Sequence, residues 1–474
     1  MRSRALALQS RGIEVLDRLG ALGDLPARAK NALDFRVYVD GRFLASFLFG
    51  GPVRGGPSGM HGMPQAEIER QLRSRLGEFG VSVEWGSQLG DATQDDSGVT
   101  ALLTNGSAIR GSWLVGCDGA HSAVRKVAGI DFTGEPVAQR FVLADVRVGW
   151  SGDRKLAYAW FEGGNSVLFA LELPDTSDSP DLWRFLGTFP LEEAEELDDD
   201  GVVDHIRRML RERARVEEVE IRDVRWTSTF RIQRRLADSY RRQRFFLAGD
   251  AAHIHSPIGG QGLNMGIGDA ENLAWKLALV VRGLADDALL DTYEAERRPF
   301  ASRILSGTTK ATRLILTEKP LGRLFRDRVV IPLTNLSVVQ RRIAEAASQL
   351  KDTYRGGPLA PQSDARFARS PRPGDRIADL SCELEDGTLT RLYNELARRW
   401  VMVLPSRGGN ACVAAAREFL GDELLTVTAV DHGVRDALLI RPDAHLAWRG
   451  NPTSTSVSGW LSAALAEPAA PFVG

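Results

Sequence analysis

The sequence predicts an α/β protein that combines an open parallel sheet, an inserted antiparallel sheet and a small C-terminal α/β domain. Three observations lead to this prediction. Residues 244–277 read as a short apolar strand, a loop rich in Gly and Pro, and a long amphipathic helix. Residues 131–240 consist mostly of strand-like segments. Residues 374–474 return to alternating strands and helices.

The composition is that of a folded globular protein. Of the 474 residues, 43% are hydrophobic and 26% are charged, which suits two or three domains. The net charge of −2 gives no reason to expect nucleic acid or a membrane surface as a partner. Cys117, Cys382 and Cys412 show neither CxxC nor metal spacing, and His253 with His255 lack a third ligand. No apolar run has transmembrane length, so we expect a cytoplasmic protein without a metal site.

The N-terminal part reads as a helix, a hairpin and a second helix. Residues 6–19 carry an apolar stripe at helical spacing. Residues 35–49 alternate as two strands around an Asp-Gly turn. Pro64 favours an extended residue before it, so the next helix should begin near Gln65. Three short strands are then predicted, at residues 81–85, 99–104 and 108–114.

A strand, an Asp-Gly turn and a helix make up the run LVGCDGAHSAVRKV, which begins at Leu114. Asp118 stands at the strand end, where a carboxylate can cap the helix that starts near Ser122. Arg125 offers a forked cation that suits a phosphate. The residues alone leave two interpretations open, an ordinary strand-to-helix cap or part of a ligand site.

The stretch RFFLAGDAAHIHSPIGGQGLNMGIGDAENLAWKL carries the clearest chemistry. Gly249 and Asp250 follow its apolar strand, at the end of the sheet where open α/β folds hold ligands. Asp250 can accept a hydrogen bond from a sugar-like hydroxyl, and Gly249 lets a ligand approach the backbone. Backbone N–H groups from Gly260 to Asn264 open a helix whose positive end favours an anion or a polarised carbonyl.

Taken together, GDAAH, GGQGLN, DAENLAWKL and the motif DGAHSAVR resemble the signatures of the flavoprotein aromatic hydroxylases, the para-hydroxybenzoate hydroxylase-like family. The resemblance implies a Rossmann-like FAD-binding domain with an inserted substrate domain. It also implies a monooxygenase that consumes NADPH or NADH and O2 and hydroxylates a small-molecule aromatic substrate. The protein's share would be positioning, a dry cavity and stabilisation of charge on the flavin.

The resemblance also assigns cofactor-binding residues. Arg4 would contact the FAD phosphates, Gln65 the flavin, and Asp118 both FAD and the nicotinamide cofactor. Pro257 would shape the substrate side of the pocket. The remaining FAD contacts would be Gly249, Asp250, Gly260, Gly262, Leu263 and Asn264. No acid–base catalyst is assigned, because in this family that role varies with the substrate.

One family feature is missing from the sequence, the GxGxxG turn that places the FAD pyrophosphate on a helix N-terminus. We expect the natural protein to extend upstream by about 35 to 40 residues, the size of a βαβ unit. The alternative is a short protein that binds flavin poorly and acts as a binding or partner subunit.

The domain boundaries follow from the same patterns. We expect an FAD-binding domain at 1–130 and 241–300, a substrate domain at 131–240, a helical connector at 301–355 and a thioredoxin-like domain at 374–474. The aromatic residues Trp160, Phe161, Trp226 and Phe230 belong either to the substrate pocket or, as we favour, mostly to the core. The thioredoxin-like domain lacks CxxC, so we predict a packing role for it.

The run RPDAHLAWR resembles the tail of larger family members that act in antibiotic and polyketide metabolism, including the rifamycin monooxygenases. This favours a polycyclic, polyketide-type aromatic substrate. A catabolic phenol or phenylpropionate hydroxylase is the alternative enzyme, and a homodimer is compatible with the family.

Overall fold

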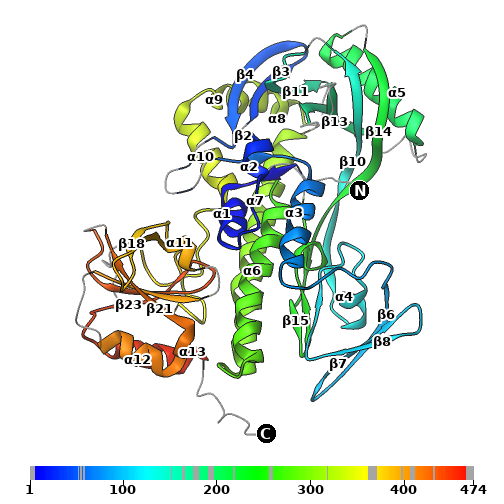
Figure 1. Ribbon diagram of the computed structural model, residues 1–474. Helices are drawn as coiled ribbons and strands as arrows, with labels where there is room; N and C mark the ends of the chain where they lie inside the picture. The colour runs from blue at the N-terminus through cyan, green and yellow to red at the C-terminus, as the bar shows by residue number, and fades with distance from the viewer. Residues whose placement is uncertain are drawn as a thin grey trace.

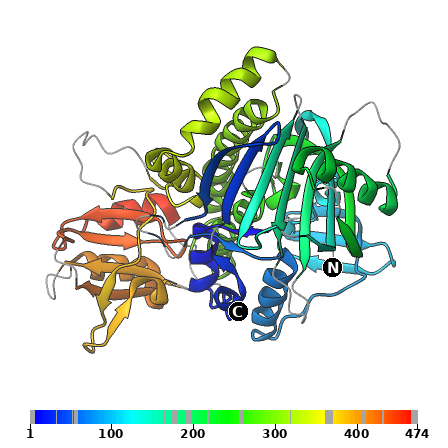
Figure 2. The same cartoon turned by 90° about the horizontal axis from the view of Figure 1, so that it is seen from above.

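The computed structural model divides into a central region built around two long helices, a large sheet beside it, and a separate C-terminal domain (Figure 1). The view from above shows the C-terminal domain on one side of the helices and the large sheet on the other (Figure 2). The structure describes residues 6–31, 33–51, 53, 56, 59–150, 152–162, 166–173, 181–189, 197–216, 219–255, 260–317, 319–360, 371–396, 399–405, 411–430 and 433–465.

A small sheet lies at the centre of the FAD-binding region predicted above. Its order is β15 (Arg241–Arg242), β16 (Phe245–Leu247) and β9 (Leu114–Gly116), with β16 parallel to β9. The residues of β16 are buried because helices α6 (Gly262–Val281) and α7 (Asp291–Ile315) contribute to the same core. The parallel pairing brings the chain after β9 and the chain after β16 to the same edge of the sheet.

The predicted strand at residues 81–85 is wrong. The other two predicted strands are present as β7 (Gly98–Leu103) and β8 (Ala108–Gly111), and an additional strand that was not predicted, β6 (Leu89–Asp95), joins them in one antiparallel sheet. Residues 81–85 have strand-like composition but no strand structure, and Trp85 is 71% exposed. A strand needs a partner, and within the described part of the chain no neighbour pairs with this segment.

The large sheet has eight strands in the order β17-β14-β10-β13-β12-β11-β3-β4. Its strands are β3 (Leu33–Val39), β4 (Arg42–Phe49), β10 (Phe132–Gly149), β11 (Leu156–Glu162), β12 (Ser166–Glu172), β13 (Leu182–Phe189), β14 (Glu220–Ala237) and β17 (His253–Ile254). The predicted hairpin at 35–49 is therefore present as β3 and β4, and it extends the sheet beyond the predicted range of 131–240.

Both faces of the large sheet are packed, because side chains along each strand alternate between them. Trp160 lies on the face covered by α5 (Asp199–Met209) and the π-helical turn η1 (Leu210–Ala214). Phe161 lies on the opposite face, in a cluster with Ile331 of α9 (Ile331–Leu333). These two aromatic residues are thus core residues, as favoured from the sequence.

The C-terminal domain is a six-stranded sheet in the order β19-β18-β21-β20-β22-β23. Its strands are β18 (Ser381–Glu383), β19 (Leu389–Arg391), β20 (Trp400–Leu404), β21 (Leu424–Ala429), β22 (Ala437–Ile440) and β23 (Leu446–Gly450). Helices α12 (Ala411–Leu420) and α13 (Ser456–Leu465) share a hydrophobic core with Trp275 and Leu279 of α6. The domain is therefore packed directly against the helix that follows the predicted FAD loop.

Short elements complete the surroundings of that loop. Strand β5 (His61–Gly62) pairs with β1 (Ala7–Leu8) and with β2 (Lys30–Asn31). Helix α1 (Ser10–Arg18) follows β1 and packs on α6, and α3 (Gln65–Gly77) begins at Gln65 as predicted. The remaining helices are α2 (Leu25–Arg28), α4 (Ala123–Val127), α8 (Pro320–Phe325), α10 (Ser337–Ser348) and α11 (Leu392–Glu395).

Candidate functional site

The turn after β16 is held in an unusual backbone conformation. Gly249 has a φ of +61°, a region in which L side chains are strained. Its N–H donates to Asp269 Oδ2 on α6, at 3.0 Å. Asp250 follows on the surface, and its carboxylate makes no hydrogen bond within the described residues. The turn thus presents a carboxylate acceptor that is unpartnered among the described residues, next to a backbone held by Asp269.

The start of α6 is tied to the N-terminal segment by one buried side chain. Asn264 Oδ1 accepts the N–H of Gln9 at 2.8 Å, and its Nδ2 donates to the carbonyls of Ala7 and Gly260 at 3.0 and 3.1 Å. A Cβ at Gly12 would lie 2.4 Å from Asn264 Oδ1, so α1 can approach this closely only with glycine there. The Asn264 side chain therefore points into the protein and organises the loop.

Backbone donors remain at the helix start. The first hydrogen bond of α6 runs from Met265 N to Gln261 O at 3.0 Å. The N–H groups of Gly262, Leu263 and Asn264 precede it and are not used within the helix. They coincide with the positive end of a 20-residue helix, which favours a negatively charged or polarised group.

The guanidinium of Arg125, which could suit a phosphate by its chemistry, binds backbone carbonyls inside the protein instead. Nη1 donates to the carbonyl of Ala251 at 2.9 Å, Nη2 donates to that of Ala120 at 2.8 Å, and the group lies 3.9 Å from the ring centre of Phe132. Arg125 is also buried. It therefore links the turn after β9 to the turn after β16.

Asp118 serves as a helix cap in the structure. Its Oδ2 accepts the N–H groups of Ala123 and Val124 at 2.7 and 3.1 Å, and Ser122 Oγ accepts that of Arg125 at 2.9 Å. The sequence left open whether Asp118 caps the helix or belongs to a ligand site, and these hydrogen bonds show that it caps the helix.

The other predicted contacts lie in different settings. Gln65 is half-buried at the start of α3, and its Nε2 donates to Glu69 Oε1 at 2.7 Å. Leu263 packs with Leu8 and Met63 in one apolar cluster, which brings the starts of α6 and α3 to a common core. Arg4 and Pro257 lie outside the described residues.

A buried cluster of charged side chains, Asp269, His253 and Arg297, lies next to the turn, and none of the three was predicted as a site residue. Asp269 Oδ2 is 2.6 Å from His253 Nε2, and Asp269 Oδ1 accepts Arg297 Nε at 2.7 Å. Burial alone would raise the pKa of Asp269, but His253 and Arg297 outweigh it and lower that pKa to about 2. Asp269 is therefore an anion beside the turn, and His253 is one of its two buried partners.

No group of three or more His, Cys, Asp or Glu side chains among the described residues could hold a metal ion. No helix among them is long and apolar enough to cross a bilayer.

Comparison with known proteins covers almost the whole chain. The family model described as FAD binding domain matches residues 1–308, and the one described as aromatic-ring hydroxylase, C-terminal, matches residues 370–468. The 6-methylpretetramide 4-monooxygenase of Streptomyces rimosus is 33% identical over 96% of this chain and 85% of its own length. The rifampicin monooxygenase of Rhodococcus hoagii is 31% identical over 97% and 90%. The solved structure of the OxyS anhydrotetracycline hydroxylase from Streptomyces rimosus matches with a TM-score of 0.78 and 32% identity, over 98% of this chain and 92% of that one.

Proposed function

The chain belongs to the FAD-dependent aromatic-ring hydroxylases, and we propose that its substrate is a polycyclic phenol or quinone of the polyketide type. It is a flavoprotein monooxygenase that uses FAD and NAD(P)H and acts on an aromatic ring. The polycyclic substrate is supported by three relatives, a 6-methylpretetramide 4-monooxygenase, a rifampicin monooxygenase and an anhydrotetracycline hydroxylase. Those relatives match through the C-terminal domain as well as the FAD-binding domain.

The proposed FAD site is supported above all by the Asp250 carboxylate, which is exposed and has no hydrogen-bond partner among the described residues. It lies on a turn whose Gly249 N–H is bound by Asp269 of α6. Asp250 would accept a hydrogen bond from a sugar-like hydroxyl of FAD, and glycine at Gly249 leaves the backbone open to it. The N–H groups of Gly262, Leu263 and Asn264 would face the part of FAD that gains negative charge on reduction. When bound, FAD supplies the redox chemistry that takes electrons from NAD(P)H and activates O2.

The other contacts and the assembly are proposed on the family resemblance. Arg4 and Pro257 would complete the FAD and substrate contacts, and Gly260 would shape the loop before α6. Gln65 would reach the flavin only after releasing Glu69. Asp118 would support FAD and NADPH through the helix it caps.

We also propose the domain division 1–130 with 241–300, 131–240, 301–355 and 374–474, with the β3–β4 hairpin added to the substrate sheet. O2 would be the co-substrate, a homodimer would be compatible with the family, and no nucleic acid or membrane partner is proposed. A cytoplasmic location is supported by three free cysteines, of which Cys382 and Cys412 are buried.

The Asp250→Ala variant tests the cofactor site. Loss of a hydrogen bond to a charged group should weaken FAD binding by about ten- to a hundredfold, which titration of the apoprotein with FAD would measure. Asp422→Ala, at an exposed aspartate of the C-terminal domain, is the matched control and should leave the affinity unchanged. Equal affinity of the Asp250→Ala and wild-type proteins would remove Asp250 from the site.

A substrate panel tests the proposed class. Anhydrotetracycline, as a polycyclic phenol, should stimulate NAD(P)H oxidation and gain one oxygen atom by mass spectrometry, whereas phenol should do neither. Hydroxylation of phenol with no turnover of the polycyclic compound would favour the catabolic alternative.

A further inference from the structure

A continuous series of buried contacts connects the turn at Gly249 to the C-terminal domain. Its members come from five separate segments: Gly249 after β16, Asp269 on α6, Arg297 on α7, Tyr354 in the connector, and His445 just before β23. Asp269, Arg297, Tyr354 and His445 are all buried. None of these four was predicted as a site residue.

The first half of the series joins the turn to α7. Gly249 N–H donates to Asp269 Oδ2 at 3.0 Å, and Arg297 Nε donates to Asp269 Oδ1 at 2.7 Å. Arg297 Nη2 also donates to the carbonyl of Met265 at 3.1 Å, in the first turns of α6. Arg297 therefore binds the Asp269 carboxylate, which contacts the Gly249 turn, and also binds the first turns of α6 through the carbonyl of Met265.

The second half joins α7 to the C-terminal domain. Arg297 Nη1 donates to Tyr354 Oη at 3.1 Å. The ring of Tyr354 lies over the ring of His445, with centroids 4.3 Å apart and an interplanar angle of 33°. The backbone N–H of Tyr354 donates to the carbonyl of Gly374 at 2.8 Å. Because ring and backbone of Tyr354 are both fixed by the C-terminal domain, the position of its hydroxyl is set by that domain.

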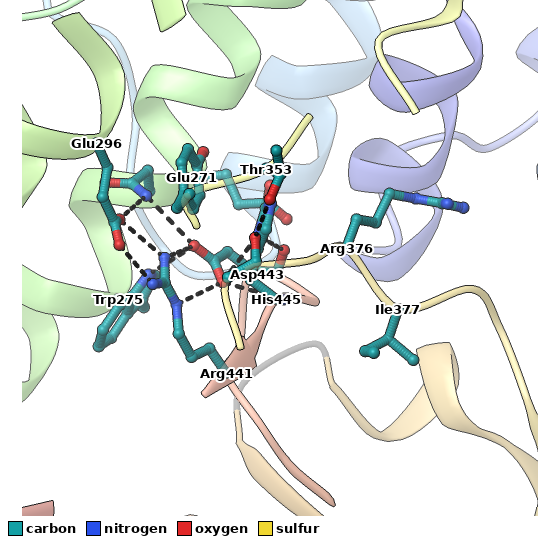
Figure 3. A network of polar contacts seen from close by, with 12 residues as sticks. Glu271, Trp275, Glu296, Thr353, Arg376, Ile377, Arg441, Asp443 and His445 are labelled. Carbon is teal, nitrogen blue, oxygen red and sulfur yellow. Dashed lines mark hydrogen bonds and ion pairs between the residues drawn. The ribbon is translucent and has the colours of Figure 1, made fainter. Parts of the chain in front are cut away.

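The C-terminal side of this series is itself rigidly attached to α6 and α7. Figure 3 shows Arg441 and Asp443 directed toward Glu296 and Trp275 across the domain boundary. Arg441 Nη1 donates to Glu296 Oε1 at 2.6 Å, and Trp275 Nε1 donates to Asp443 Oδ2 at 3.2 Å. The guanidinium of Arg441 also lies 5.3 Å from the ring centre of Tyr354. The domain thus cannot shift without disturbing buried ionic contacts.

We propose that Arg297 and Tyr354 are positioning residues through which the C-terminal domain fixes the Gly249–Asp250 turn for FAD. The proposal rests on the proposed role of Asp250 in FAD binding. It gives the C-terminal domain, which lacks CxxC, a defined part in the activity of the FAD site. Tyr354 and Arg297 touch neither substrate nor cofactor in this account, and they act only through Asp269 and the backbone of Gly249.

The decisive variant is Tyr354→Phe, which removes the hydroxyl that meets Arg297 but keeps the ring over His445. Tyr393→Phe is the matched control, because Tyr393 is equally buried and its Oη donates to the carbonyl of Ile377 within the C-terminal domain. Both variants lose one buried hydrogen bond, but only Tyr354 connects to Asp269. Asp269→Asn is the stronger variant at the other end of the series.

Hydrogen exchange of the apoprotein gives a readout that does not require cofactor. Exchange of amides in residues 244–255 should rise about two- to tenfold in Tyr354→Phe, the equivalent of one hydrogen bond, and stay at the wild-type rate in Tyr393→Phe. FAD affinity should fall by a similar factor in Tyr354→Phe only. Wild-type exchange in both variants, or an equal rise in both, would overturn the proposal.

Combining Tyr354→Phe with Asp250→Ala separates this proposal from the proposed FAD site. If Tyr354 acts through the turn, its effect on FAD affinity should shrink in the Asp250→Ala background. A full effect of Asp250→Ala with none from Tyr354→Phe would overturn the positioning role and keep the FAD site. Faster exchange in Tyr354→Phe with no effect of Asp250→Ala on FAD affinity would keep the link to the turn but overturn the role of Asp250.

Discussion

The two flanks of the FAD-binding region are built in opposite ways. The C-terminal flank, where Asn272, Trp275, Lys276 and Glu296 face the C-terminal domain, buries charged groups almost completely. The open flank, residues 79–85, leaves apolar groups in water. Its exposed members are Phe79, Val81, Val83 and Trp85.

The difference shows that partners, and not polarity alone, decide what is buried. Glu296 is fully buried because Arg441, Lys276 and Asn272 all donate to it. Burial alone would raise its pKa, but Arg441 and Lys276 outweigh this effect and lower the pKa to about 2. The apolar residues of the open flank stay exposed because, among the described residues, no strand pairs with this segment and no hydrophobic cluster includes it.

The largest expected effect comes from breaking the C-terminal flank with Arg441→Met. This change leaves the carboxylates of Glu296 and Asp443 buried without their shared cation, which should cost about 3–5 kcal/mol of unfolding free energy. Chemical denaturation would measure it. Arg282→Met is the control, because its pair with Glu423 crosses the same boundary in solvent and should cost at most about 1 kcal/mol. Equal losses of unfolding free energy in the two variants would show that the buried ion pair contributes no more than the exposed one.

The pH dependence of the C-terminal flank should be the next largest effect. Burial lowers the pKa of His445 from 6.5 to about 4, against the opposing effect of Asp443. The unfolded chain therefore binds the proton first, and His445 should reduce stability by up to about 3 kcal/mol as pH falls from 6.5 to 4. Burial also raises the pKa of Asp352 to about 7, which acts in the opposite direction over this interval.

Comparison of wild type with His445→Asn isolates this contribution, because Asp352 is common to both proteins. Asn keeps a side-chain amide donor near the carbonyl of Asp443, where His445 Nδ1 lies at 2.9 Å. Melting temperatures should diverge between pH 6.5 and 4, with the wild type losing more. Parallel curves would show that His445 does not titrate as described.

A smaller effect is expected at the start of α4, where Asp118 caps the helix. Asp118→Ala removes the acceptor for two N–H groups at the start of α4 and should cost about 0.5–2 kcal/mol. Asp118→Ser keeps a capping oxygen and should recover part of the loss. A neutral Asp118→Ala change in thermal unfolding would show that Ser122 caps this helix alone.

The smallest effect is expected from Trp85→Ser on the open flank. Trp85 is 71% exposed and its ring is contacted by the guanidinium of Arg73, 5.9 Å from the ring centre, so its loss should change stability by no more than about 0.5 kcal/mol. The same change should lower the fluorescence of a hydrophobic dye bound to the protein, since it removes exposed apolar surface. A loss of several kcal/mol would show that this side chain is packed in solution.

Local sequence patterns predicted most elements but not the network that joins them. The strand at 245–248, the helix from Gly262 and the hairpin of β3 and β4 were predictable because their signals lie within a few residues. The strand at 81–85 was not, because strand structure depends on a neighbour elsewhere in the chain.

The same reasoning separates the predicted site residues from those that were missed. Gly249 and Asp250 could be predicted from a strand end followed by glycine. The pairing of Asp269 with Arg297, and of Arg297 with Tyr354, joins residues 28 and 57 positions apart, which no periodicity reveals. The sequence around Arg125 was compatible with a phosphate contact. The carbonyls of Ala251 and Ala120, which bind its guanidinium instead, are brought to it only by the tertiary structure.

The contact between Arg441 and Glu296 also has a consequence for biosynthesis. The two residues are 145 positions apart, so at 5–20 residues per second Arg441 leaves the ribosome about 7–30 seconds after Glu296. The interval is longer for Arg11, because the carbonyl to which it donates belongs to Asp443, 432 positions later in the chain. During that interval the helices of the FAD-binding region carry charges without their final partners. Completion of this region is therefore a late step of synthesis, and the nascent chain is most exposed to aggregation before its last strands emerge.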